Sequence, residues 1–327
     1  MHSPAAIEVA QRLGLKMGRA NLDEFGQLLI TLGKADRNLL AVTSDSRGSG
    51  KLGPFAAALP DQIVELGIAE QNLVGVAAGL ASAGKIVFAV SPACFLTARS
   101  LEQIKNDVAY SDQPVNLVGI SAGTSYGALG STHHSLHDLA VLRAINNIDI
   151  ICPADNFETA ETIKAAAARK RPTYVRFGKA PLYHLSTNQP KFEIGRARII
   201  RDGTDLAFIA TGETVIHALL AAEMLSEKGI SARVLSMHTI KPLDTAAILA
   251  AAKDCRAIIT VEEHCVFGGL GEAVAAVLLQ AGEHPKFKIV GIPDEYTVTG
   301  AQSDIFRHYG INMEGLAKTA SELHSRA

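Results

Sequence analysis

The sequence predicts an α/β fold made of two doubly wound domains, the first with a mostly parallel sheet and the second smaller. Three observations support this prediction. Short apolar runs alternate along the chain with longer amphipathic segments, which is typical of parallel strands joined by helices. The 327 residues suggest two domains, and 48% hydrophobic against 20% charged residues suffices for a large core. A stretch rich in proline and polar residues divides the chain, so we expect domains at 1–182 and 195–327 and a linker at 183–194.

The first domain is expected to open with a short helical lead and then a helix over 19–34, where Leu22, Phe25 and Leu29 share one face. The compact apolar run 39–43 predicts a strand, which ends where polar residues and glycines take over. We expect further strands at 63–65, 86–90, 115–121, 148–151 and 173–176, and helices at 70–83, 97–110, 136–145 and 156–169.

The second domain repeats the alternation. Sheets of this kind are covered by helices on both faces, and their sites form at the carboxyl ends of the strands. We expect strands at 205–211, 232–236, 256–261 and 286–290, and helices at 214–228, 244–252 and 270–280.

Composition and charge exclude several classes of protein. A net charge of −2 gives no strong field toward nucleic acid or anionic membranes. The chain has no run of about 20 apolar residues that could span a bilayer, and its first residues do not resemble a signal peptide. Its four cysteines fall in no CxxC spacing. We therefore expect a soluble cytoplasmic protein with reduced thiols that binds neither nucleic acid nor membrane.

The segment 67–81 follows a predicted strand and opens a helix with Glu70 in its first turn. A glutamate at this place is common in helices, because it complements the helix dipole. Gly75 and Gly79 likewise fit close helix packing. The pattern alone therefore leaves a purely structural role for Glu70 open.

The same segment closely resembles the glutamate-containing signature of the thiamine-diphosphate enzymes of the transketolase group, which includes deoxyxylulose-phosphate synthase. Other blocks resemble this group in the same order over essentially the whole chain. The resemblance implies a thiamine-pyrimidine-binding domain followed by a transketolase C-terminal domain, as in the C-terminal subunit of a split transketolase. The matching blocks are 36–45, 95–104, 127–134, 153–155, 175–177, 261–264 and 268–271.

For the cofactor, the resemblance implies that the Glu70 carboxyl bonds N1′ of the thiamine aminopyrimidine. This contact promotes the imino tautomer that takes the proton from C2 of the thiazolium ring. Such a carboxyl works best in a water-poor pocket, which the apolar helix after Glu70 favours. Phe95 is implied as the pyrimidine-stacking ring. Ala98 and Leu101 stand at the spacings of further aromatic residues in full-length members, so we expect thinner stacking here.

The resemblance also implies roles toward the substrate. His133 is implied as a catalytic partner for the hydroxyls of the donor sugar, and His264 as a residue near the site from the second domain. A structural role for His264 is an equally common alternative. His133 and His137 are four residues apart, but no third ligand and no HExxH pattern accompany them, so we expect no metal site in this chain.

The implied ligands of the substrate phosphate are Ser49 and either Arg176 or Lys179. Arginine suits an oxyanion because its guanidinium is a planar fork. Lys16 or Arg19 is a further candidate.

Two departures from the family concern the substrate. Leu129 stands where the family has an aspartate that reads an acceptor hydroxyl, and Ser121 stands where it has a phosphate-contacting histidine. Leucine cannot accept a hydrogen bond, and a site that lacks its polar partner discriminates strongly. We hypothesise an unusual sugar phosphate, such as the branched ketose apulose 4-phosphate.

The family binds the cofactor's diphosphate and a divalent ion through a Gly-Asp-Gly segment and a later Asn, and this sequence contains no Gly-Asp-Gly. The resemblance therefore implies an N-terminal partner subunit that carries this site with Mg²⁺. We expect two copies of each chain around a homodimeric core, with thiamine diphosphate between unlike subunits.

The favoured function is transfer of a two-carbon glycolyl unit from a ketose phosphate to an aldehyde or ketone acceptor. A 2-oxo-acid dehydrogenase beta-type subunit or a deoxyxylulose-phosphate-synthase-like subunit is the alternative within enzymes. A non-catalytic, regulatory transketolase-like protein is the alternative from another class.

Overall fold

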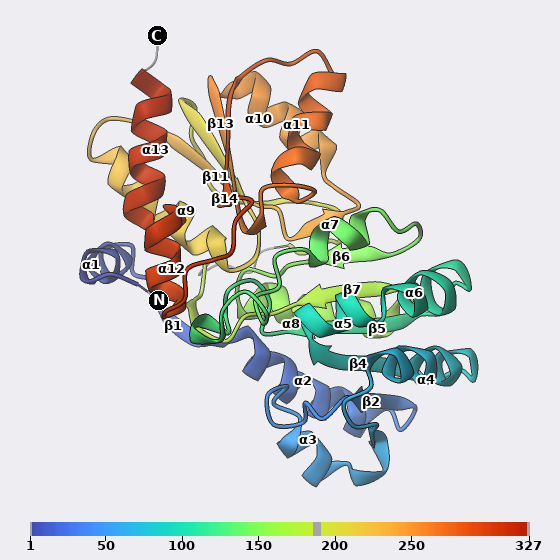
Figure 1. Ribbon diagram of the computed structural model, residues 1–327. Coiled ribbons are helices and arrows are strands. Elements are labelled where there is room, and N and C mark those ends of the chain that lie inside the picture. Colours follow the sequence, from blue (N-terminus) through green and yellow to red (C-terminus); the bar gives the residue numbers. More distant parts are fainter. Residues whose placement is uncertain (1, 186–190, 326–327) are drawn as a thin grey trace.

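The computed structural model describes residues 2–185 and 191–325, which form two α/β units. The first, blue to green in Figure 1, is built on a seven-stranded sheet, and the second, yellow to red, on a five-stranded sheet. A separate antiparallel pair joins β1 (Met17–Ala20) to β8 (Pro181–Tyr183). The predicted α/β class with mostly parallel sheets is confirmed.

The larger sheet has the strand order β12-β6-β7-β5-β4-β2-β3, and six of its strands are parallel. β12 alone is antiparallel, and it comes from the second half of the chain. The carboxyl ends of the six parallel strands therefore meet at one edge. Their bounds are β2 Leu39–Thr43, β3 Ile63–Glu65, β4 Ile86–Pro92, β5 Val115–Ile120, β6 Asp149–Ile151 and β7 Thr173–Arg176, with β12 at Thr239–Lys241.

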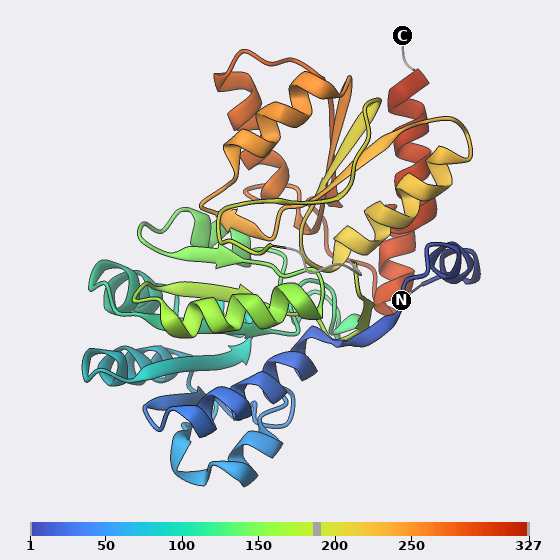
Figure 2. The same cartoon turned by 180° about the vertical axis from the view of Figure 1, so that it is seen from behind.

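Helices cover both faces of this sheet, because successive side chains of each strand point to opposite faces. Phe88 of β4 faces a core formed with α2 and α8, while Val87 and Ala89 face a core formed with α4 and α7. Figure 2 shows α8 lying across the first of these faces beside α2. The helices are α2 Asn21–Ala35, α3 Gly53–Ala58, α4 Glu70–Ser82, α5 Ala93–Arg99, α6 Leu101–Gln103, α7 Asp138–Arg143 and α8 Asn156–Ala168.

The helix predicted over 97–110 is instead broken into α5, α6 and a π-helical segment at Ile104–Tyr110. The break is at Ser100, whose backbone leaves helical geometry at φ −110° and ψ 24°. Its hydroxyl donates to the carbonyl of Leu96 at 2.5 Å, a side-chain bond that competes with the helical ladder. Short π-helical segments are frequent near functional sites.

The second sheet has the order β14-β13-β10-β11-β9, with β9 antiparallel to β11. The helices α9 and α13 pack together on one face, and α10 and α11 pack together on the other (Figure 1). No helix in the described ranges is both long and apolar enough to cross a membrane. The bounds are β9 Arg198–Arg201, β10 Leu206–Ala210, β11 Ala232–Ser236, β13 Ala257–Cys265, β14 Lys286–Ile292, α9 Val215–Ser226, α10 Thr245–Asp254, α11 Leu270–Gln280, α12 Gln302–Tyr309 and α13 Met313–Ser325.

The two units exchange elements. The strand β12 belongs by sequence to the second unit but pairs with β6 of the first. In return, α1 (Pro4–Arg12) packs against α9 of the second unit. The predicted domain bounds, 1–182 and 195–327, stay a prediction. Of the predicted linker 183–194, residues 186–190 lie outside the described residues.

Candidate active site

Glu70 begins α4, in the segment that follows β3. Its side chain is only 4% exposed, and both of its carboxylate oxygens accept hydrogen bonds from Nη1 of Arg99, at 2.9 and 3.0 Å. Arg99 ends α5, and its side chain is half exposed. A buried carboxylate is thus held in a fixed orientation by a cation that keeps contact with solvent.

Three rings continue from this ion pair. The Arg99 guanidinium lies 4.4 Å from the centroid of the Phe95 ring. The rings of Phe95 and His133 meet edge to face with centroids 5.3 Å apart, and those of His133 and Tyr126 do so at 5.4 Å. Nζ of Lys179 lies 4.0 Å from the centroid of Tyr126. We call Phe95, His133 and Tyr126 the aromatic row; it has a cation at each end.

The fold brings these residues together because each follows the carboxyl end of a parallel strand. Phe95 lies on α5 directly after β4, the loop 121–134 follows β5, and Lys179 follows β7. The loop turns sharply, since Ser121 and Gly127 have φ values of 54° and 51°. Such a backbone costs a non-glycine residue on the order of 1 kcal/mol or more, and this strain is often found at functional sites.

Four of the predicted site residues, Glu70, Phe95, His133 and Lys179, are therefore brought together. Two members of the arrangement, Arg99 and Tyr126, were missed. Arg99 had a weak signal in its spacing of four from Phe95, which puts both side chains on one helix face. Tyr126 had none, because it lies in an irregular loop.

Three other predicted residues lie elsewhere on the first unit. Ser49 is exposed in the loop after β2, where its hydroxyl donates to the carbonyl of Ser46 at 3.3 Å. Leu129 is 55% exposed in the same loop as His133. Leu101 is half-buried and packs against the core beneath α4.

Arg176 is buried rather than open to solvent. Its Nε lies 3.4 Å from a carboxylate oxygen of Asp138, and its Nη2 donates to the main-chain carbonyl of Glu263 at 3.1 Å. Asp138 also accepts from the hydroxyl of Tyr174 at 2.7 Å. The guanidinium thus joins the two units, and the structure does not bring it to the aromatic row.

His264 is fully buried between the units. Its Nδ1 donates to the carbonyl of Cys265 at 2.7 Å, and its Nε2 accepts from the main-chain N–H of Ala140 at 3.4 Å. These two bonds fix the neutral tautomer, and burial lowers the pKa of His264 to about 4. The structure does not bring His264 to the aromatic row either.

Family models match most of the chain. Residues 19–183 match the model described as transketolase, pyrimidine binding domain, and residues 195–316 match the transketolase C-terminal domain.

Several relatives match over nearly the full length of both chains. A subunit of the apulose-4-phosphate transketolase of Phocaeicola vulgatus is 51% identical over 91% of this chain and 95% of its own. A subunit of the 6-deoxy-6-sulfo-D-fructose transketolase of a Clostridium species is 32% identical over 93% and 94%. A 1-deoxy-D-xylulose-5-phosphate synthase of Desulfotalea psychrophila is 36% identical over 91% of this chain but only 47% of its own.

Solved structures agree in fold. A split gene transketolase, described as an inactive beta4 tetramer, superposes with a TM-score of 0.84 and 34% identity, over 94% of this chain and 99% of its own. A transketolase from Campylobacter jejuni has a TM-score of 0.78 at 20% identity, over 94% of this chain and 47% of its own, and this likeness concerns the fold alone.

Proposed function

The chain belongs to the transketolase family, and we propose that it is the C-terminal subunit of a split transketolase that moves a two-carbon glycolyl unit from a ketose phosphate to an aldehyde or ketone acceptor. The observation that carries this proposal is the buried Glu70 carboxylate, which Arg99 links to the Phe95 ring at the carboxyl edge of the larger sheet. Relatives that match over both full lengths are named transketolase subunits. Retention of Glu70, Phe95 and His133 in one arrangement favours an enzyme over a regulatory relative.

The residues present fit the pyrimidine end of thiamine diphosphate. When bound, the cofactor supplies the nucleophilic carbon of its thiazolium ring. Glu70 exchanges a proton with N1′ of the aminopyrimidine, Phe95 packs against the ring, and Leu101 adds an apolar margin. Each Glu70 oxygen has a second lone pair beyond the one that Arg99 occupies. Arg99 can therefore stay in place while the carboxylate bonds the cofactor.

His133 and Lys179 act on the substrate in this proposal. His133 stands in the aromatic row and bonds hydroxyls of the donor sugar, while Lys179 binds the phosphate with Ser49. Burial lowers the pKa of Lys179, and the nearby charge of Lys51 lowers it further. Two neighbouring ammonium groups repel each other, and a bound phosphate would relieve this repulsion. Of the two cations that the sequence offered for phosphate, we choose Lys179, because Arg176 already pairs with Asp138.

The site is completed by a second polypeptide. We propose that an N-terminal partner supplies the Gly-Asp-Gly segment, the Asn and Mg²⁺, and that two copies of each chain assemble in the cytoplasm. This chain's lack of Gly-Asp-Gly and the names of its relatives support the proposal. The substrate we propose is a branched ketose phosphate such as apulose 4-phosphate, which the relative that is 51% identical and the exposed Leu129 support.

The first test is co-expression with the N-terminal partner, followed by assay of glycolyl transfer from a panel of ketose phosphates with thiamine diphosphate and Mg²⁺. Glu70→Gln is expected to lower kcat by at least about 100-fold, the usual contribution of a positioned proton-transfer group. Glu161→Gln, which changes the charge of a partly exposed carboxylate paired with Lys164 on α8, is the matched control and is expected to keep full activity. Equal turnover by the Glu70→Gln and native enzymes would refute the assignment.

A further inference from the structure

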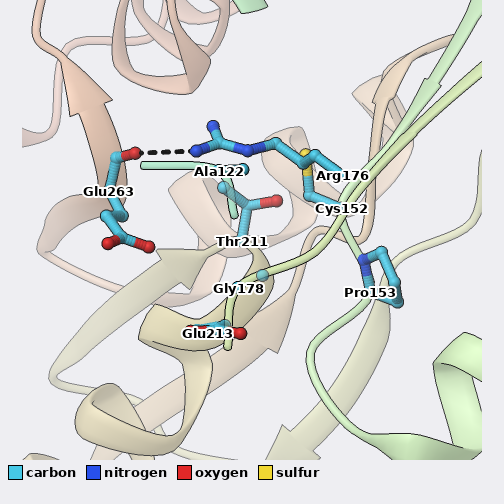
Figure 3. A pocket seen from close by; sticks show the side chains of 9 residues that line it. Ala122, Cys152, Pro153, Arg176, Gly178, Thr211, Glu213 and Glu263 are labelled. Carbon is cyan, nitrogen blue, oxygen red and sulfur yellow. Dashed lines mark hydrogen bonds between the residues drawn. The ribbon is translucent and has the colours of Figure 1, made fainter. Parts of the chain in front are cut away.

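Two carboxyl groups of the second unit, Glu213 and Glu263, lie buried against the loops of the first unit (Figure 3). Glu213 lies in the turn between β10 and α9, and Glu263 lies on β13. Both line a cavity of about 20 Å³ together with Arg176 and Gly178. That volume holds about one water molecule, so the pair is not itself a site for substrate.

Glu263 is bonded as an ionised carboxylate. Its Oε1 accepts from the main-chain N–H and from the hydroxyl of Thr124, both at 2.8 Å, and from Nε2 of Gln302 at 2.7 Å. Three donors on one oxygen favour the charged form. Thr124 lies two residues before Tyr126 of the aromatic row, in the same loop.

Glu213 accepts fewer and longer hydrogen bonds than Glu263. Its Oε2 accepts from the same nitrogen of Gln302 at 3.5 Å, and the main-chain N–H of Gly178 lowers its pKa by less than burial raises it. A buried carboxyl with so few donors favours the neutral form. The side chain lies so close to Gly178 that a Cβ there would stand 2.2 Å from both carboxyl oxygens. Gly178 directly precedes Lys179, the cation at the end of the aromatic row.

The charges around the pair do not balance two negative carboxylates. Burial raises the pKa of both Glu213 and Glu263, the charge of Glu263 raises the pKa of Glu213 further, and the nearby Arg176 lowers both. Arg176 is already shared with Asp138. Two other titratable groups of the first unit, Cys152 and Tyr174, interact electrostatically with Arg176, and Cys152 also lines the cavity. From the second unit, Glu262 interacts electrostatically with both Cys152 and Arg176.

We propose that Glu213 and Glu263 share one proton, and that this proton holds the Tyr126 and Lys179 loops of the first unit against the second. Glu213 is then a positioning residue for the phosphate-binding end of the active site. The pair touches no substrate and acts through Thr124 and Gly178. The positioning role rests on the proposed function, because that function gives Lys179 its part in phosphate binding. The shared proton does not depend on the proposed function.

The direction of the pH dependence follows from linkage. A carboxyl whose pKa is raised on folding stabilises the folded state fully below its unfolded pKa of about 4.3. That stabilisation is lost as the pH rises toward the folded value, which for Glu213 is about 8. Above it, two adjacent carboxylates repel each other and loosen the loops.

The closing experiment compares Glu213→Gln with the native chain in the complex reconstituted with the partner, thiamine diphosphate and Mg²⁺. The native KM for the ketose phosphate is expected to rise about tenfold from about pH 7 to about pH 9, the effect of one unit of linked pKa. Glutamine imitates the protonated acid, so the variant's KM is expected to vary less than about twofold. Glu272→Gln, an exposed carboxylate of the second unit, is the control and keeps the native pH dependence.

An infrared spectrum of the chain without its partner tests the proton separately. At neutral pH the difference between native and Glu213→Gln spectra is expected to contain the C=O stretch of a protonated carboxyl, and the Glu272→Gln difference to lack it. A missing band overturns the shared proton, whatever the activity assay gives. A band together with an unchanged pH dependence of KM overturns the positioning role. If the native complex fails to transfer glycolyl units, the proposed function is contradicted. The infrared spectrum still tests the shared proton in that case.

If Glu213→Gln does not fold, the other carboxyl of the pair provides the same test. Glu263→Gln removes the other negative charge and retains an oxygen that accepts from Thr124 and Gln302. It is expected to flatten the KM profile in the same way. A native profile in this variant would contradict the pair.

Discussion

Arg99 is the residue on which the burial of Glu70 depends. Replacing it with leucine removes two charge-assisted hydrogen bonds from a carboxylate that is 4% exposed. Arg99→Leu is therefore expected to lower the free energy of unfolding by about 1.5–3 kcal/mol, as for other bonds to charged groups. It should also weaken thiamine diphosphate binding in the reconstituted complex. Urea unfolding and a cofactor titration measure the two effects.

Two further variants make this test specific. Arg99→Lys keeps the charge but loses the planar contact with Phe95, so an intermediate loss is expected. Arg37→Leu changes an exposed arginine after α2 and should stay within about 0.5 kcal/mol of native. If Arg99→Leu were as stable as Arg37→Leu, the ion pair would be irrelevant to the site.

Leu129 carries the prediction about substrate choice. An aspartate there would restore an acceptor for a hydroxyl, and a hydrogen bond to a charged group changes preference by about tenfold or more. Leu129→Asp is therefore expected to shift the ratio of kcat/KM values toward acceptors that carry that hydroxyl. Leu279→Asp, at another exposed leucine far along the chain, controls for added charge. Identical acceptor preferences in both variants would show that the side chain at position 129 does not affect the choice of acceptor.

The residues show what the sequence could predict about the site. Glu70, Phe95, His133 and Lys179 were named from motifs and lie together. The choice between Arg176 and Lys179 required the fold, because the buried partner of Arg176, Asp138, is distant in sequence.

Among the elements, most of the alternating strands and helices were predicted, whereas the break in one helix and the added edge strand β12 were not. The strands 39–43 and 63–65 and the helix 270–280 have the predicted bounds. The predicted helix 97–110 is broken because the Ser100 hydroxyl bonds the helix backbone, a local contact that apolar periodicity does not reveal. The three-residue strand β12 gave no signal, since its place depends on a pairing between distant segments.

The strand β12 also carries a stability prediction. Ile240 is 2% exposed and lies in the core that runs from the larger sheet to α10 of the second unit. Ile240→Ala is expected to cost about 2–5 kcal/mol in unfolding free energy, through lost burial and a cavity. Ile199→Ala, on the exposed side of β9, is expected to cost less than about 0.5 kcal/mol. Chemical denaturation of both variants decides this, and equal midpoints would contradict the role given to β12.

At the scale of the whole molecule, composition and alternation were sufficient for the α/β class but not for the way the two units meet. The interface includes buried polar groups, such as Arg176 and His264, whose hydrogen bonds join residues far apart in sequence. No periodicity marks such residues, because their positions depend on partners rather than on a repeating apolar face. The family resemblance supplied the site, and the packing showed which polar residues join the units.

The exchange of α1 and β12 has a consequence for any attempt to dissect the chain. A truncation between the halves would remove an antiparallel edge strand from the larger sheet, and from the second unit the helix that packs against α9. Each fragment would expose apolar surface that the intact polypeptide hides, and neither would be a self-sufficient module. We therefore expect each half to be less stable alone than within the continuous chain.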